Sequence, residues 1–146
     1  MRKALVPIDE SQVSKSLIPY AFEYAKREGI QRVDFLHVIP EYERSWDYIL
    51  TDVDERIIES NKKRFKSVIE EALEGIEDDV EYDLIIVSGV PYSKIIEKAE
   101  DGYEIILIGH RGLSNMEKFF IGSVAAKVVR HSPCTVLVYH PEGEER

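Results

Sequence analysis

The sequence predicts an α/β protein built on an open, five-stranded parallel sheet with helices on both faces. Two observations carry this prediction. Short apolar segments alternate with amphipathic helical patterns along the chain, which is typical of β-α-β connections. The apolar segments are also nearly continuous, as expected of strands that are buried on both faces. We therefore expect crossover helices that cover both sides of the sheet.

The composition indicates one soluble domain that covers residues 1–146. Apolar residues make up 44% and charged residues 32% of the sequence, as in globular proteins. The net charge of -9 argues against non-specific nucleic-acid binding, which needs a positive surface. No segment approaches the roughly 20 apolar residues of a membrane-spanning helix. The single cysteine, Cys134, excludes an internal disulfide, so that we expect a cytoplasmic protein.

The first strand and helix are expected within residues 3–29. Residues 3–8 form a short apolar strand, and Ser11 and Ser14 are both candidate N-caps of the helix that follows. Gly29 ends this helix as a C-cap. Pro19 removes one backbone hydrogen bond and bends the first turns unless the helix begins late.

The middle of the chain contains its least regular segment. Residues 32–39 form the second predicted strand, and a long helical pattern that ends near residue 73 precedes the third strand at 82–88. Between them, residues 41–53 mix aromatic and acidic residues. Two interpretations remain for this segment: a loop whose aromatic rings pack on neighbouring helices, which we favour, or a lid over a ligand or partner surface.

The last part of the chain combines a strand, a glycine loop and a helix. After a short helix at residues 92–99, an apolar strand at 105–108 leads into Gly109-x-x-Gly112, and nine residues later Gly122-Ser123 begins a helix. Backbone N–H groups at a helix start are unpaired and carry the positive end of the helix dipole, which suits a phosphate. Residues 135–139 then form the last strand.

The spacing Gly-x-x-Gly, nine residues, Gly-Ser resembles the nucleotide-binding motif of the universal stress protein family. Residues 6–9 (VPID) resemble that family's first strand and its acidic end. Residues 130–138 (RHSPCTVLV) resemble its last helix–strand junction. The resemblance covers nearly the whole chain, and residues 40–80 are its least characteristic part.

The resemblance implies a Rossmann-like fold of the adenine nucleotide alpha hydrolase type. Together with right-handed crossovers it gives the strand order 3-2-1-4-5. The chain then reverses direction between the first and fourth strands, and open α/β sheets bind ligands at such switch points. Asp9 and Gly109 would lie at the two strand ends that flank this point.

The resemblance also implies the ligand, ATP with Mg²⁺ held by its phosphates, and the residues that bind it. Pro7 and Ile8 would line the base pocket, the backbone of Val38 would contact the adenine edge, and Asp9 would lie near the ribose. Glu10 departs from the family's frequent glycine and adds negative charge. The expected nucleotide-binding residues are Pro7, Ile8, Asp9, Val38, Ile108, Gly109, Arg111, Gly112, Gly122, Ser123 and Val124.

Each of these residues also has a purely structural interpretation. Ser123 is a good N-cap by residue type, although we favour a phosphate contact. Arg111 could pair with a phosphate or stay solvated, and Asp9 could cap the first helix. Pro7, Ile8 and Val38 would be ordinary core residues if residue type alone were considered.

We expect a nucleotide-dependent switch in the stress response that forms a homodimer through residues 135–139. The alternatives are an interaction protein that needs no nucleotide and a slow adenine-nucleotide hydrolase. No residue is placed as a general base beside an attacking water, so efficient autonomous hydrolysis is not expected. The four histidines show no metal-ligand spacing, and no side-chain metal site is expected.

Overall fold

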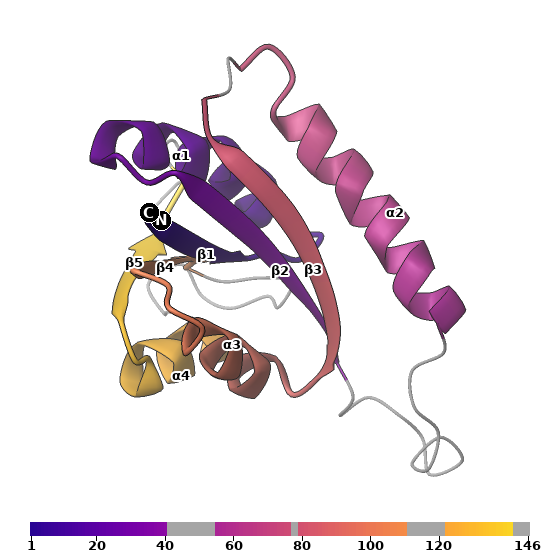
Figure 1. Ribbon diagram of the computed structural model, residues 1–146. Helices are drawn as coiled ribbons and strands as arrows, with labels where there is room; N and C mark the ends of the chain where they lie inside the picture. The colour runs from indigo at the N-terminus through magenta and orange to yellow at the C-terminus, as the bar shows by residue number, and fades with distance from the viewer. Residues whose placement is uncertain (41–54, 77–78, 111–121, 142–146) are drawn as a thin grey trace, which may run out of the picture.

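The computed structural model describes residues 1–40, 55–76, 79–110 and 122–141. A five-stranded parallel sheet has the order β3-β2-β1-β4-β5, which confirms the predicted fold class (Figure 1). Residues 41–53, for which the sequence left the alternatives of a packed loop and a lid, lie outside the described residues. The elements are β1 (Lys3–Pro7), α1 (Gln12–Glu28), β2 (Arg32–Pro40), α2 (Glu55–Ala72), β3 (Glu81–Gly89), α3 (Pro91–Ala99), β4 (Ile105–Gly109), α4 (Ser123–His131) and β5 (Thr135–Tyr139).

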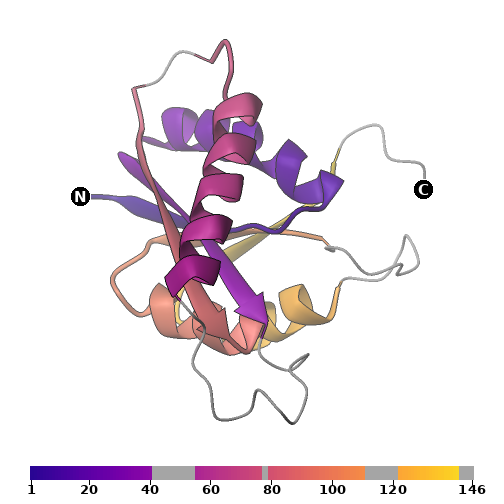
Figure 2. The same cartoon turned by 90° about the vertical axis from the view of Figure 1, so that its right-hand side faces the viewer.

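Helices cover both faces of the sheet, as the apolar strands predicted. Helices α1 and α2 lie on one face and α3 and α4 on the other (Figures 1 and 2). The first layer is packed around Phe22, Phe35 and Phe65, which are fully buried. The second contains Ile106 and Val128. None of the described helices has the length and apolar character needed to cross a membrane.

Helix α1 shows how its local sequence decides the ends. The Ser11 hydroxyl accepts a hydrogen bond of 3.2 Å from the Ser14 N–H, so Ser11 is the N-cap and Ser14 is not. Gly29 ends the helix at φ 73°, a left-handed conformation that glycine adopts without strain. The helix continues through Pro19, whose missing N–H removes one internal hydrogen bond.

The pairing of the central strands is uneven along their length. Strands β1 and β2 are in register from Lys3↔Arg32 to Pro7↔Leu36. Strands β1 and β4 are paired at Ala4↔Ile105 and Leu5↔Ile106, and their register ends there. The carboxyl ends of β1 and β4 therefore separate at the point where the chain reverses direction across the sheet.

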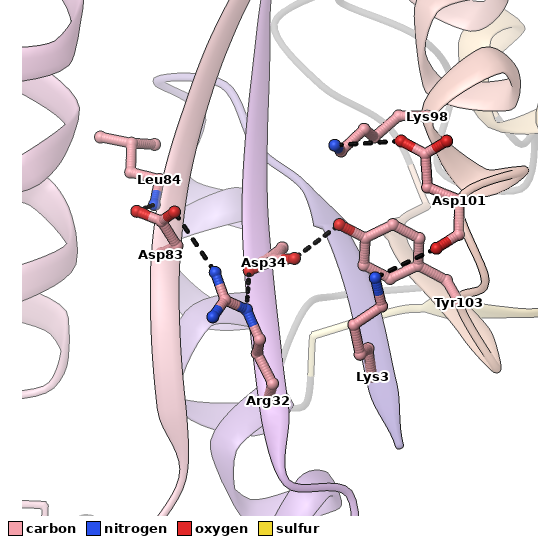
Figure 3. Close-up of polar contacts among 8 residues, drawn as sticks. All are labelled: Lys3, Arg32, Asp34, Asp83, Leu84, Lys98, Asp101 and Tyr103. Atoms are coloured by element: carbon pink, nitrogen blue, oxygen red, sulfur yellow. Dashed lines mark hydrogen bonds and ion pairs between the residues drawn. The ribbon is translucent and has the colours of Figure 1, made fainter. Parts of the chain in front are cut away.

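A polar network centred on the buried Asp34 lies toward the amino-terminal ends of the strands (Figure 3). Asp34 on β2 is 4% exposed and accepts hydrogen bonds from the Tyr103 hydroxyl, at 2.5 Å, and from Nε of Arg32, at 2.8 Å. Arg32 also reaches Asp83 on β3 at 3.3 Å. Burial, followed by the bond to Asp34, raises the pKa of Tyr103 above its ordinary value. The network joins β2, β3 and the turn before β4.

Candidate functional site

A cavity of about 730 Å³ opens at the carboxyl ends of the strands. Its size falls in the range of small-molecule sites, and its position is the switch point of the sheet. Arg111 and Gly112 lie outside the described residues. The other nine predicted binding residues all line this cavity: Pro7, Ile8, Asp9, Val38, Ile108, Gly109, Gly122, Ser123 and Val124.

One wall of the cavity is apolar. Val38, Ile95, Ile108 and Ala125 are buried in the core layer beneath α3 and α4, and all four also line the cavity. Val38 and Ile108 are thus both core residues and wall residues. An apolar wall of this kind suits the face of an aromatic ring.

The start of α4 supplies backbone amides that have no acceptor among the described residues. Gly122 is the N-cap, at φ -63° and ψ 153°, and Ser123 is the first helical residue, so the alternative that Ser123 caps the helix is wrong. The Gly122 N–H donates a 2.7 Å hydrogen bond to the carbonyl of His110. The N–H groups of Ser123, Val124 and Ala125 have no hydrogen-bond acceptor in the described parts of the chain. They are available to an anion.

Asp9 is held at the end of β1 by hydrogen bonds to α1. Its Oδ1 atom accepts from the Ser11 N–H at 2.8 Å and from the Ser14 hydroxyl at 3.0 Å. Its own N–H donates to the Ser14 Oγ at 2.8 Å. The Oδ2 atom accepts no hydrogen bond from any described residue. Asp9 therefore presents a fixed carboxylate with one oxygen still available.

Helix α2 contributes a polar wall that sequence reasoning missed. Asn61 and Arg64 line the cavity together with Glu10. The Arg64 Nε lies 2.9 Å from a Glu10 carboxylate oxygen, and its Nη2 donates to the Asn61 Oδ1 at 2.7 Å. Arg64 thus balances the negative charge that Glu10 adds near the site. The helical pattern predicted this helix, but not that the helix brings Asn61 and Arg64 to the carboxyl ends of the strands.

His37 was expected only as a strand residue, yet it also lines the cavity. Its ring stacks on Phe65 of α2, with centroids 4.1 Å apart. Its Nδ1 lies 2.9 Å from the Ile8 carbonyl, which can only accept, so Nδ1 carries the proton. Burial lowers the pKa of His37, and the Ile8 hydrogen bond and the Asp9 charge oppose this with smaller effects. At neutral pH the ring is therefore uncharged, and Nε2 is an acceptor.

The described residues contain no cluster of three His, Cys, Asp or Glu side chains that could hold a metal ion.

The sheet and cavity define an α/β protein of the class that binds ligands at a switch point. A sequence model of the Universal stress protein family matches residues 1–140, and the chain belongs to this family. It is 31% identical to the universal stress protein YxiE of Bacillus subtilis over 144 residues, which cover 93% of this chain and 97% of YxiE.

Solved structures agree with this assignment. The structure of MJ0577, a universal stress protein of Methanocaldococcus jannaschii, has a TM-score of 0.78 and 27% identity, with 98% of each chain covered. Two others are complexes. A universal stress protein with cAMP has a TM-score of 0.65 at 19% identity, covering 95% of this chain and 96% of its own. The universal stress protein of Archaeoglobus fulgidus in complex with dAMP has a TM-score of 0.63 at 22% identity, and the match covers 94% of this chain and 97% of its own.

Proposed function

We propose that the protein binds ATP in this cavity and acts as a nucleotide-dependent switch in the stress response. One observation carries the proposal: at the sheet's switch point the cavity combines an apolar wall, a fixed carboxylate and helix amides that have no acceptor among the described residues. Two relatives of the same fold are complexes with adenine nucleotides, cAMP and dAMP, which supports an adenine nucleotide as the ligand.

Each part of the cavity suits one part of ATP. The adenine ring would lie on the apolar wall beside Val38, whose backbone would contact the base edge. The ribose would lie against Asp9. The phosphates would accept from the amides of Ser123 and Val124, with Gly122 leaving room for their approach.

Mg²⁺ would accompany the triphosphate without a dedicated protein site. The ion favours oxygen ligands and retains several waters, so phosphate oxygens and water complete its shell. The positive ion would offset part of the repulsion between the phosphates and the protein's net charge of -9.

The proposal also includes a cellular location, an oligomeric state and the rate of ATP hydrolysis. We place it in the cytoplasm, as a homodimer that pairs through β5. Strand β5 lies at one edge of the sheet, next to β4 alone, and an uncovered edge favours pairing with another strand. We assign it no efficient autonomous ATPase activity.

Calorimetric titration of the purified protein tests the binding function. ATP with Mg²⁺ is expected to bind with one site per chain, and GTP more weakly because its base edge carries different donors and acceptors. Native mass spectrometry would show any nucleotide that co-purifies. No heat of binding at saturating ATP and no co-purified nucleotide would overturn the proposal and favour a nucleotide-independent interaction protein.

The switch requires a second measurement. ATP must change the conformation or the binding surface of the protein, because a ligand that binds two states equally shifts neither. Solution NMR spectra with and without ATP are expected to show shifted amide signals outside the residues that line the cavity. Shifts confined to the cavity would leave nucleotide binding intact and contradict the switch.

A further inference from the structure

The peptide group that joins Ile8 to Asp9 is held at both of its polar atoms. The His37 Nδ1–H donates to the Ile8 carbonyl at 2.9 Å, and the Asp9 N–H donates to the Ser14 Oγ at 2.8 Å. The His37 ring and the Ser14 side chain are both held in place by their surroundings. The His37 ring is stacked on Phe65, and Ser14 is buried in α1. Side chains from β2 and α1 thus fix this peptide from opposite sides.

The His37 side chain donates to the Ile8 carbonyl, which would normally accept from a backbone amide of the neighbouring strand. The Ile8 N–H donates to the Leu36 carbonyl at 2.9 Å, which continues the parallel ladder past the end of β1. In a regular ladder the Ile8 carbonyl would next accept from the N–H of Val38. No such bond is present, and the imidazole donates to that carbonyl instead. The Val38 N–H has no acceptor within the described residues and is open to a ligand.

Fixing the peptide also fixes the Asp9 carboxylate. Ser14 bonds both the Asp9 N–H and Oδ1, and Ser11 adds a second bond to Oδ1. The carboxylate therefore has little freedom to rotate, and its Oδ2 accepts from no donor in the described parts of the chain. An acceptor that is already oriented binds a donor with a smaller loss of conformational entropy.

We propose that His37 and Ser14 are positioning residues that set a preference of the site for ligands with ribose hydroxyls. They hold Asp9 so that Oδ2 accepts a hydrogen bond from a hydroxyl of the sugar. The inference rests on the proposed nucleotide binding and adds the origin of sugar selectivity. A carboxylate can only accept, so a sugar without hydroxyl donors leaves Oδ2 without its partner after water is displaced.

The test compares ATP with 2′-deoxy-ATP, 3′-deoxy-ATP and 2′,3′-dideoxy-ATP by calorimetry. The wild-type protein is expected to bind ATP about ten-fold or more tightly than the dideoxy compound, as one hydrogen bond to a charged group suggests. His37→Leu and Ser14→Ala should weaken ATP binding to near the level of the dideoxy compound. Their affinity for the dideoxy compound itself should stay within about two-fold of wild type.

Two further variants make the comparison specific. His37→Asn places an amide N–H where Nδ1–H lies and is expected to restore most of the preference for ATP. Ser16→Ala is the matched control, because the Ser16 hydroxyl on the same helix contacts the Tyr139 hydroxyl, at 2.9 Å, and not Asp9. It should bind every ligand as the wild type does. Thermal unfolding reports whether each variant is folded. If His37→Leu does not fold, Ser14→Ala alone is compared with the wild-type protein.

The outcomes separate this inference from the proposed function. If the wild-type protein binds ATP and dideoxy-ATP equally, nucleotide binding stands and the positioning role is overturned. If His37→Leu and Ser14→Ala weaken both ligands equally, the two residues only maintain the structure, and the inference is also overturned. If the wild-type protein binds neither ligand, both proposals fail.

Discussion

The Tyr103 hydroxyl donates a 2.5 Å hydrogen bond to Oδ2 of Asp34, and both residues are buried (Figure 3). Arg32 bonds the other carboxylate oxygen, at 2.8 Å, so both oxygens of Asp34 have a donor. These groups lie toward the amino ends of the strands, whereas the cavity lies at the carboxyl ends. The Tyr103–Asp34–Arg32 network therefore lies at the end of the sheet opposite the cavity, and none of its three residues lines the cavity.

Tyr103→Phe is expected to lower the free energy of unfolding by about 1–3 kcal/mol, because a buried carboxylate oxygen loses its donor. ATP affinity should not change, since the network does not line the cavity. Urea denaturation and calorimetry measure the two quantities. The matched control is Tyr92→Phe, whose hydroxyl makes no hydrogen bond to the described residues. An equal loss of stability in both variants would contradict the role of the Asp34 bond.

Gly122→Val is expected to abolish ATP binding and keep the fold. A branched side chain would occupy space beside the free amides of α4, where the phosphates are proposed to lie. The backbone at φ -63° and ψ 153° is a conformation that valine adopts readily, so little strain is expected. Calorimetry measures binding, and circular dichroism confirms folding. Folded variant protein that binds ATP like the parent would show that the phosphates bind elsewhere.

Ser123→Ala should have a smaller effect than Gly122→Val. It removes one hydroxyl but keeps the amides, and we expect a loss of about 1 kcal/mol in binding, a few-fold in affinity. Ser93→Ala, on the exposed surface of α3, is the control in the same titration. Unchanged affinity for ATP would mean that the Ser123 hydroxyl makes no phosphate contact.

The lowered pKa of His37 predicts a loss of stability in acid. Because the folded protein binds this proton less readily than the unfolded chain, the unfolded state gains protons first as pH falls below the ordinary value of 6.5. Stability should therefore fall from that pH toward the folded-state pKa, and His37 should add no pH dependence above it. Urea midpoints of wild type and His37→Asn across this range give the difference due to His37. Parallel curves would contradict the prediction.

A homodimer through β5 is expected in sedimentation experiments at micromolar concentration. Thr135→Asp would put a charged side chain on each edge strand, which disfavours the pairing of two edges. It should weaken the dimer without unfolding the chain, because Thr135 is exposed. Thr135→Ser is the control. A monomer in the wild-type protein, or equal dimerisation of both variants, would count against pairing at this edge.

The strands and the residues at their carboxyl ends could be predicted from the sequence for a physical reason, whereas the strand order also needed the family resemblance and the right-handed crossover rule. Apolar runs identify buried strands, and residues such as Asp9 and Gly109 directly follow them, so they must lie at the carboxyl edge of the sheet. The sequence left the N-cap of α1 open between Ser11 and Ser14. The structure decides it, because the Ser14 hydroxyl is hydrogen-bonded to Asp9 while the Ser11 hydroxyl accepts from the Ser14 N–H.

The contribution of α2 could not be predicted in the same way. Periodicity shows which helix face is inward, and Phe65 is indeed buried. It does not show how far the helix axis reaches along the sheet. Only that position brings Arg64 to Glu10 and Phe65 to the ring of His37. The role of His37 was hidden for a related reason, since its hydrogen bond depends on where β1 leaves the sheet.

The short pairing of β1 with β4 has a mechanical consequence. At the amino end the two strands are tied by the Glu104 N–H to the Lys3 carbonyl, at 2.9 Å, and by the Arg2–Glu104 ion pair, at 2.6 Å. At the carboxyl end the backbone provides no tie beyond Leu5↔Ile106. A nucleotide that reaches from Asp9 to Ser123 would cross this gap and act as a removable cross-link. The half of the sheet formed by β4 and β5 would then resist being pulled from β1 more strongly when ligand is bound.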